Sequence, residues 1–213
     1  GDFAGAADAY RLAWKRSPNS PRGRSCGAKA VEHFSRAGGN ENVVAAAELA
    51  EEMLEKSPAG SFAKWIGYRA VHERRRINQH AEATVAGNEL LKKGTAGDRE
   101  LEFEVCTTMV ESYERIGQHA NAAQTIGRAR RIHDTPDLHR RQVERLHSAG
   151  AEPRQMERVV ADYMKKYPKR DDRYLVQGLL GLAYLRTDNK SRGLDVLAEV
   201  IKHDARSYGF AET

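Results

Sequence analysis

Arginines gathered in short runs are the residues of this 213-residue chain whose chemistry is easiest to name. One run is Arg74, Arg75 and Arg76, and a second group lies between residues 128 and 131. A guanidinium group offers a planar fork that binds both oxygens of a carboxylate, so such groups suit acidic ligands. Basic residues in the last turn of a helix are also commonly solvated charges that complement the helix dipole. The residues alone leave both interpretations open.

The sequence carries none of the motifs that mark common enzyme classes. It has no phosphate-binding loop, dinucleotide fingerprint or nucleophile elbow. His72 and Glu73 are not followed by the second histidine of a zinc protease motif. Glu100, Glu102 and Glu104 fall at the expected start of a helix, where negative charge suits the dipole. We therefore expect no catalytic residue and no cofactor.

Histidines offer no ligand spacing typical of a metal site. His133, His139 and His147 are six and eight residues apart, whereas two ligands on one helix face lie three or four residues apart. We expect solvated or capping histidines here, and no metal. His80 and His119 hold equivalent positions in two similar segments, which favours a half-buried packing role over a ligand or pH-sensing pair.

Charge and cysteine content narrow the function only slightly. The formal net charge of +5 is a mild basic excess in a chain with 31% charged residues, so it permits an acidic partner without requiring one. Cys26 and Cys106 are the only cysteines, too few for a disulfide framework or a metal knuckle. We expect both to be small buried residues.

Apolar residues do not form a membrane span, which needs about 20 in a row. The most apolar stretch, residues 175–185, is short and contains Gln177. The sequence lacks an initiator methionine and a signal peptide, and it opens inside a helical pattern, so we expect a fragment of a longer protein. Cytoplasm and bacterial cell envelope or periplasm both remain open as compartments, as does the oligomeric state.

Apolar spacing predicts an all-α chain, because no useful stretch alternates with the period of a strand. The expected helices span 1–17, 25–36, 41–56, 61–76, 79–93, 98–116, 118–132, 136–148, 153–167, 171–186 and 190–203. Their short links predict antiparallel neighbours. Residues 19–24 are the nearest thing to a linker, so we predict one domain over residues 1–206 and a frayed tail over 207–213.

One packing pattern recurs along the chain, with small or apolar residues at offsets of 0, 3, 7 and 10. Its copies are Phe3, Ala6, Tyr10 and Ala13, then Val43, Ala46, Ala50 and Met53, then His119, Ala122, Ile126 and Ala129. In the first two copies a proline, Pro18 or Pro58, follows at offset 15. Such a repeat indicates helical hairpins that each bury one face against the next.

These offsets resemble the second helix of the tetratricopeptide repeat, and the first helix has a counterpart in Leu180, Gly181 and Tyr184. Residues 77–83 resemble residues 116–122, which supports an internal duplication. The likeness covers nearly the whole chain, although its periods of 40 and 39 residues exceed the roughly 34 of that family. It implies a right-handed superhelical solenoid of about eleven helices.

The resemblance also implies a concave groove lined by the first helix of each hairpin. Mapped onto this sequence, the groove residues are Trp65, Tyr68, Arg69, His72, Arg75 and Arg76, then Thr107 and Glu111, then Arg141 and Arg145. Aromatic rings beside guanidinium groups suit an acidic peptide. We therefore predict a non-catalytic scaffold that binds a peptide segment or a partner subunit in this groove.

Two other functions compete with this prediction. One alternative hypothesis is that the chain is the helical, non-catalytic part of a larger enzyme such as a peptidoglycan lytic transglycosylase. Nucleic-acid binding through the arginine clusters is less favoured, because few aromatic positions are available for base stacking. The first helix of the last hairpin would carry three leucines on its groove face, Leu179, Leu182 and Leu185. They would serve as an apolar anchor for a partner or as packing for further repeats.

Overall fold

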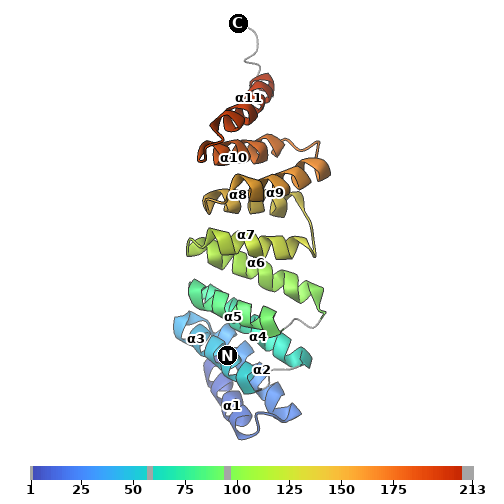
Figure 1. Cartoon of the computed structure of the whole chain (residues 1–213). Helices are drawn as coiled ribbons and strands as arrows, with labels where there is room; N and C mark the ends of the chain where they lie inside the picture. The colour runs from blue at the N-terminus through green and yellow to red at the C-terminus, as the bar shows by residue number, and fades with distance from the viewer. Residues whose placement is uncertain (1, 57–59, 94–96, 208–213) are drawn as a thin grey trace. The chain divides into compact units, whose positions relative to one another are not determined.

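Eleven α-helices and no strand make up the part of the chain that the computed structural model describes, residues 2–56, 60–93 and 97–207 (Figure 1). The chain divides into two compact units, unit 1 over Gly1–Ile116 and unit 2 over Gly117–Thr213, and each is described by itself. The all-α fold class is confirmed. The single domain over residues 1–206 stays a prediction.

Unit 1 is a series of helices in which each packs against its neighbour in sequence, and α4 also contacts α6. Its helices are α1 Phe3–Arg16, α2 Pro21–Ala37, α3 Gly39–Lys56, α4 Gly60–Arg76, α5 His80–Lys93 and α6 Arg99–Arg115. Short links between neighbours make antiparallel hairpins. The contact of α4 with α6 places first helices of successive hairpins side by side.

Unit 2 repeats this arrangement, and α8 also contacts α10. Its helices are α7 His119–Arg130, α8 Pro136–Ser148, α9 Pro153–Lys166, α10 Arg173–Leu185 and α11 Lys190–Ser207. Its core gathers buried side chains of α8, α9 and α10, including Met156, Tyr163 and Tyr184. Among the described helices of both units, none combines the length and apolar character that crossing a membrane requires.

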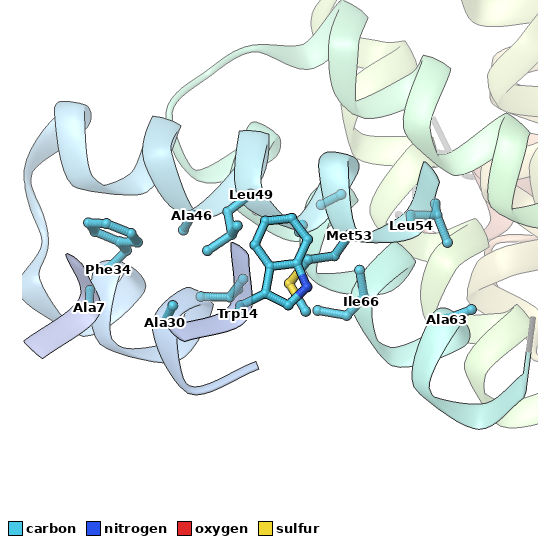
Figure 2. Packing of buried hydrophobic residues seen from close by; sticks show 13 residues of the cluster. Ala7, Trp14, Ala30, Phe34, Ala46, Leu49, Met53, Leu54, Ala63 and Ile66 are labelled. Atoms are coloured by element: carbon cyan, nitrogen blue, oxygen red, sulfur yellow. The ribbon is translucent and has the colours of Figure 1, made fainter. Parts of the chain in front are cut away.

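The core of unit 1 is built around Trp14 and Met53, both almost fully buried (Figure 2). Gly27 of α2 lies against this pair, and a Cβ atom there would come within 2.3 Å of the Met53 Cε atom. The absence of a side chain at Gly27 therefore lets α2 approach the Trp14 ring closely. Burial of these large side chains contributes apolar stabilisation to unit 1.

The repeated offset pattern locates the buried face correctly in two of its three copies. In α3 all four positions are buried, and in α7 Ala122, Ile126 and Ala129 are buried. In α1 the pattern is displaced, because Ala7 and Trp14 are buried whereas Phe3 is 38% exposed. The helix packs mainly against α2, and its Trp14 also reaches Met53 and Lys56 of α3, so only the side that carries Ala7 and Trp14 faces the core.

Helix starts follow capping residues rather than the first apolar residue. Ser20 caps α2 by accepting a hydrogen bond from the Gly23 amide at 2.9 Å, and Pro21 takes the first helical position. The predicted linker over residues 19–24 is therefore mostly helix, and the predicted start at residue 25 was wrong. The signal was the Ser-Pro pair, since serine favours the N-cap and proline the first turn.

Backbone geometry agrees with the similarity between residues 77–83 and 116–122. Asn78 and Gly117, which hold equivalent positions in the two similar segments, both have left-handed φ angles, 60° and 71°. Glycine and asparagine are the residues that adopt this conformation most readily, so the same helix-ending turn is made twice. Pro58 and Gly94, predicted as helix ends, and the predicted tail beyond Ser207 lie outside the described residues.

Candidate functional site

The three consecutive arginines at the end of α4 point toward three different helices. Arg74 donates to both carboxylate oxygens of Glu51 on α3, at 2.9 and 2.7 Å. Arg75 donates to Glu111 on α6 at 2.8 Å. Arg76 donates to the Ser35 hydroxyl of α2 at 2.7 Å. Because successive residues on a helix turn by about 100°, one run of like charge ties α4 to three neighbours.

Glu73 is the fully buried carboxylate toward which the polar side chains of α2 and α4 converge. Arg69 contacts its Oε1 atom at 2.6 Å, and Arg76 donates to its Oε2 atom at 2.7 Å. The Ser35 hydroxyl donates to Oε1 at 3.1 Å and also accepts from Arg69 at 2.9 Å. Two guanidinium groups therefore share one carboxylate, which leaves one positive charge in excess at this point.

The electrostatics of Glu73 favour its ionised form. Burial alone would raise the pKa of this carboxyl, but hydrogen bonding from His72 and the charges of Arg69 and Arg76 outweigh burial and lower the pKa below its ordinary value. The charged network is therefore in place at neutral pH. Its members are held by several contacts each, so Arg69 and Arg76 have fixed positions before any ligand arrives.

Aromatic side chains lie beside these arginines on α4. Trp65 is half-buried and packs against the core of unit 1. The Tyr68 ring lies 6.1 Å from the His72 ring. Burial raises the pKa of Tyr68, and the nearby Glu104 carboxylate of α6 raises it further, while a hydrogen bond with Thr108 acts in the opposite direction. Tyr68 is thus a neutral, half-buried group at the contact between α4 and α6.

The structure brings together the predicted groove residues that belong to unit 1. We call them the arginine–tyrosine face: Trp65, Tyr68, Arg69, His72, Arg75 and Arg76 on α4, with Thr107 and Glu111 on α6. The Arg75–Glu111 ion pair spans the two helices. Arg141 and Arg145 are half-buried on α8 in unit 2, so they are not part of this face as described.

Sequence reasoning missed the partners of these arginines. Glu73 follows Arg69 by four residues and precedes Arg76 by three, a spacing that places all three on one helix face. That signal was readable. The contribution of Ser35 was not readable from the sequence. Ser35 lies 38 residues before Glu73, and only the packing of α2 against α4 brings the two side chains together.

A second charged cluster occupies unit 2 around α7, α8 and α9. Arg130 donates to Asp134 at 2.7 Å and to Asp162 at 2.9 Å. Lys166 lies 2.6 Å from Asp134 and 3.2 Å from Asp162, so it bridges the same two carboxylates. Each carboxylate of this cluster is therefore paired with two cations. Hydrogen bonds from Arg130 and Lys166 outweigh burial and hold the pKa of both carboxyl groups below their ordinary values.

His139 lies fully buried beside this cluster, so the expectation of a solvated or capping histidine was wrong for this residue. Its Nε2 atom lies 2.9 Å from the Val159 carbonyl oxygen and so donates to it, while Nδ1 has no hydrogen-bond partner among the described residues. Burial, followed by the charge of Arg130, lowers its pKa. The ring is neutral at physiological pH.

Asp134, His139 and Asp162 place three ligand atoms of suitable type within 4.8 Å of one another. Carboxylate and imidazole groups are ligands that zinc accepts. However, Arg130 and Lys166 already neutralise both carboxylates, and a bound dication would lie against two fixed positive charges. The arrangement favours a structural ion network that joins α7, α8 and α9.

Cys106 is buried as predicted, whereas Cys26 is only half-buried against the core of unit 1, so that part of the prediction was wrong. His80 confirms the packing interpretation. Its Nδ1 atom lies 3.4 Å from the Ser112 hydroxyl of α6, and burial lowers its pKa. The ring is half-buried at the contact between α5 and α6.

Comparison with known proteins places the fold among the tetratricopeptide-repeat structures. YrrB, described as a TPR protein with an unusual peptide-binding site, matches with a TM-score of 0.52 at 15% identity, over 92% of this chain and 93% of that chain. A tetratricopeptide repeat protein from Parabacteroides merdae matches with a TM-score of 0.51 at 12% identity, over 95% and 73%. No family model and no curated protein matches the sequence.

Proposed function

We propose that the chain is a non-catalytic interaction scaffold whose arginine–tyrosine face binds a peptide segment of a partner protein. The observation that carries the proposal is the shared carboxylate of Glu73. Two guanidinium groups on one buried carboxylate leave a local charge of +1 beside the half-buried rings of Trp65 and Tyr68. A carboxylate next to an apolar or aromatic side chain on the partner fits this combination.

Preorganisation supports this assignment. Arg69 and Arg76 are fixed by Glu73 and Ser35, and Arg75 is fixed by Glu111. Side chains that are already ordered lose little conformational entropy when a ligand binds, so more of the contact energy appears as affinity. The charges of the arginine–tyrosine face support only a limited preference for acidic peptides. Glu111 neutralises Arg75, and the exposed Glu104 lies near Tyr68, so the excess charge is confined to Arg69 and Arg76.

The fold supports the same conclusion at a coarser level. YrrB, which shares the helical-repeat fold, is itself described as having a peptide-binding site. We infer peptide or protein binding for this chain from its own face, in which first helices lie side by side and present rings and guanidinium groups together. No catalytic step is assigned to these residues.

The test begins with selection of peptides. Random peptides displayed on phage are selected on the wild-type chain, synthesised with a fluorescent label, and titrated against variants by fluorescence anisotropy. We expect Trp65→Ala and Tyr68→Ala to weaken binding about tenfold each, because a buried aromatic anchor contributes more than about 1 kcal/mol. Thermal unfolding followed by circular dichroism confirms that each variant is folded.

The matched control is Leu12→Ala, which removes an exposed apolar side chain of α1 outside the arginine–tyrosine face. Its affinity for the same peptides should equal that of the wild type. Arg76→Gln should weaken the binding of peptides that contain Asp or Glu more than it weakens the binding of neutral peptides. Equal affinities for wild type, Trp65→Ala and Tyr68→Ala would remove the arginine–tyrosine face as the binding surface.

A further inference from the structure

A second surface of unit 1 lies between the second helices of two hairpins. A hollow of about 490 Å³ opens between α3 and α5, with α4 as its floor. We call it the acidic groove, and its lining residues are Glu51, Leu54, Glu55, Ala70, Arg74, Ala81, Glu82, Val85, Ala86 and Glu89. Ala70 and Arg74 lie on a different side of α4 from Arg69 and Arg76, so this groove is separate from the arginine–tyrosine face.

Negative charge dominates the acidic groove, although the whole chain has a formal net charge of +5. Four glutamates and one arginine line it, so four negative charges minus one positive charge give a local charge of −3. Arg74 is bound by Glu51 through both of its carboxylate oxygens. The other three glutamates, Glu55, Glu82 and Glu89, are exposed at the groove, and Glu89 also lies 3.7 Å from the Lys92 ammonium group.

Apolar side chains lie between these charges. Val85 of α5 is 64% exposed at the groove, and Leu54 of α3 is 9% exposed. Ala70 and Ala86 supply small side chains that leave room above the floor. An exposed valine above buried and small apolar side chains, with carboxylates around it, offers apolar contact and complementary charge to an amphipathic helix.

The fold alone does not produce this charge. In unit 2 a hollow of about 520 Å³ lies in the corresponding position, between α7 and α9 and over α8. Its polar lining residues are the amides Asn121, Gln124, Gln142 and Gln155, and none of its lining residues is charged. The two hollows share their position in the hairpin series but differ in chemistry, so the acidic residues of the first are a property of this sequence.

We propose that the acidic groove binds a basic amphipathic helix of a partner protein, with apolar residues on one face and lysine or arginine beside them. The apolar face would cover Val85 and Leu54. The flanking cations would lie near Glu55, Glu82 and Glu89, where charge complementarity speeds encounter and selects against acidic partners. The proposal does not depend on the function of the arginine–tyrosine face.

The probe is a short synthetic peptide with leucine at helical i, i+3, i+4 and i+7 positions and lysine elsewhere. Its fluorescence anisotropy is followed with the wild-type chain, with Glu55→Gln/Glu82→Gln/Glu89→Gln, and with a control triple variant. The control is Asp188→Asn/Asp195→Asn/Glu199→Gln, which makes the same change in net charge at exposed positions of unit 2. Two further peptides replace every lysine by glutamate or every leucine by serine.

We expect the leucine–lysine peptide to bind the wild type and the control variant equally, and to bind the groove variant about tenfold more weakly, because each exposed charge pair contributes a factor of roughly two to five. Both altered peptides should bind more weakly than the original. Val85→Ser should reduce affinity, and Trp65→Ala should leave it unchanged, which separates this groove from the arginine–tyrosine face. No binding by the wild type, or an equal loss in both triple variants, would overturn the proposal.

Discussion

Glu73 is fully buried yet charged, and this is possible only because neighbouring side chains take over the role of solvent. Arg69, Arg76, His72 and Ser35 all contact its carboxylate. Removing one member of such a network leaves the others desolvated and unpaired, which costs more than the network contributes as a whole. The carboxylate therefore decides whether the two arginines keep their positions.

Glu73→Gln should destabilise unit 1 by about 3 kcal/mol, at the low end for a broken buried pair because both arginines reach solvent. Urea unfolding followed by tryptophan fluorescence measures the change, since Trp14 and Trp65 both belong to unit 1. Glu55→Gln, at an exposed carboxylate of the same unit, should change stability by less than about 0.5 kcal/mol. Equal stabilities of Glu73→Gln and the wild type would show that the network contributes nothing.

Acid should weaken the network around Glu73, and the direction of the pKa shift decides the pH range in which this happens. The folded pKa of Glu73 lies below the unfolded value, so its contribution is complete above the unfolded pKa of about 4.3 and is lost as pH falls through the lower folded pKa. Tryptophan-monitored urea midpoints should therefore fall between pH 7 and about pH 3.5. Glu73→Gln should show a smaller fall. A fall of the same size in both proteins would contradict the assigned pKa direction.

At the residue scale the sequence predicted arginines that bind the carboxylates of a partner, and it did not predict that these arginines also pair with carboxylates of their own chain. Arg74, Arg75 and Arg76 hold Glu51, Glu111 and Glu73 of their own chain. Two of those partners lie 23 and 36 residues away in the sequence. Such pairs follow from helix packing, which a linear spacing pattern does not specify. The arginine–tyrosine face as a binding surface remains a proposal.

The packing of the helices in this chain depends on close approaches of the backbone as much as on apolar periodicity. Gly23 lies in the first turn of α2, and a Cβ atom there would come 1.8 Å from the Ser17 carbonyl oxygen. The link between α1 and α2 can therefore be as tight as it is only with glycine at this position. Gly178 in α10 differs, because a Cβ atom there would have the Val200 Cγ1 atom as its nearest neighbour, at 3.9 Å.

Alanine substitutions at these two glycines should have opposite effects. Gly23→Ala should destabilise by at least about 2 kcal/mol, because backbone must move to relieve the overlap. Gly178→Ala should stabilise by about 0.5–1 kcal/mol, because alanine loses less conformational entropy in a helix. Urea unfolding followed by circular dichroism measures both. Destabilisation by Gly178→Ala would mean that α10 and α11 pack more tightly than described.

Helix number and order were predictable because small or apolar residues recur at helical spacing, as Ala46, Ala50 and Met53 show. Helix ends were less predictable, and the register of α1 was wrong by one residue at Ala7 and Trp14. An apolar pattern shows that a helix has a buried side. It does not show which neighbours the helix has, and α1 packs mainly against α2.

The whole molecule contains two compact units, and the prediction that residues 1–206 form one domain concerns how these units unfold. Repeat proteins are coupled mainly between neighbouring repeats, so one domain means that this coupling continues along the chain. Both tryptophans, Trp14 and Trp65, belong to unit 1, whereas helices of both units contribute to circular dichroism. The two signals therefore report different parts of the molecule.

We predict that urea unfolding followed by tryptophan fluorescence and by far-ultraviolet circular dichroism gives coincident curves, as coupled repeats require. Val143→Ala, at a fully buried position of unit 2, should then shift the fluorescence transition of unit 1 as well. Separate midpoints, or a fluorescence midpoint that Val143→Ala leaves in place, would show two independently unfolding domains.

Peptide binding at the arginine–tyrosine face is tested most directly by the indole N–H signals of the two tryptophans in a nitrogen-15 NMR titration. Trp65 is half-buried on that face, and Trp14 is 1% exposed within the core. Addition of a selected peptide should shift the Trp65 signal progressively and leave the Trp14 signal in place. A saturating peptide that moves neither indole signal, while shifting amides of α3 and α5, would contradict the proposed function.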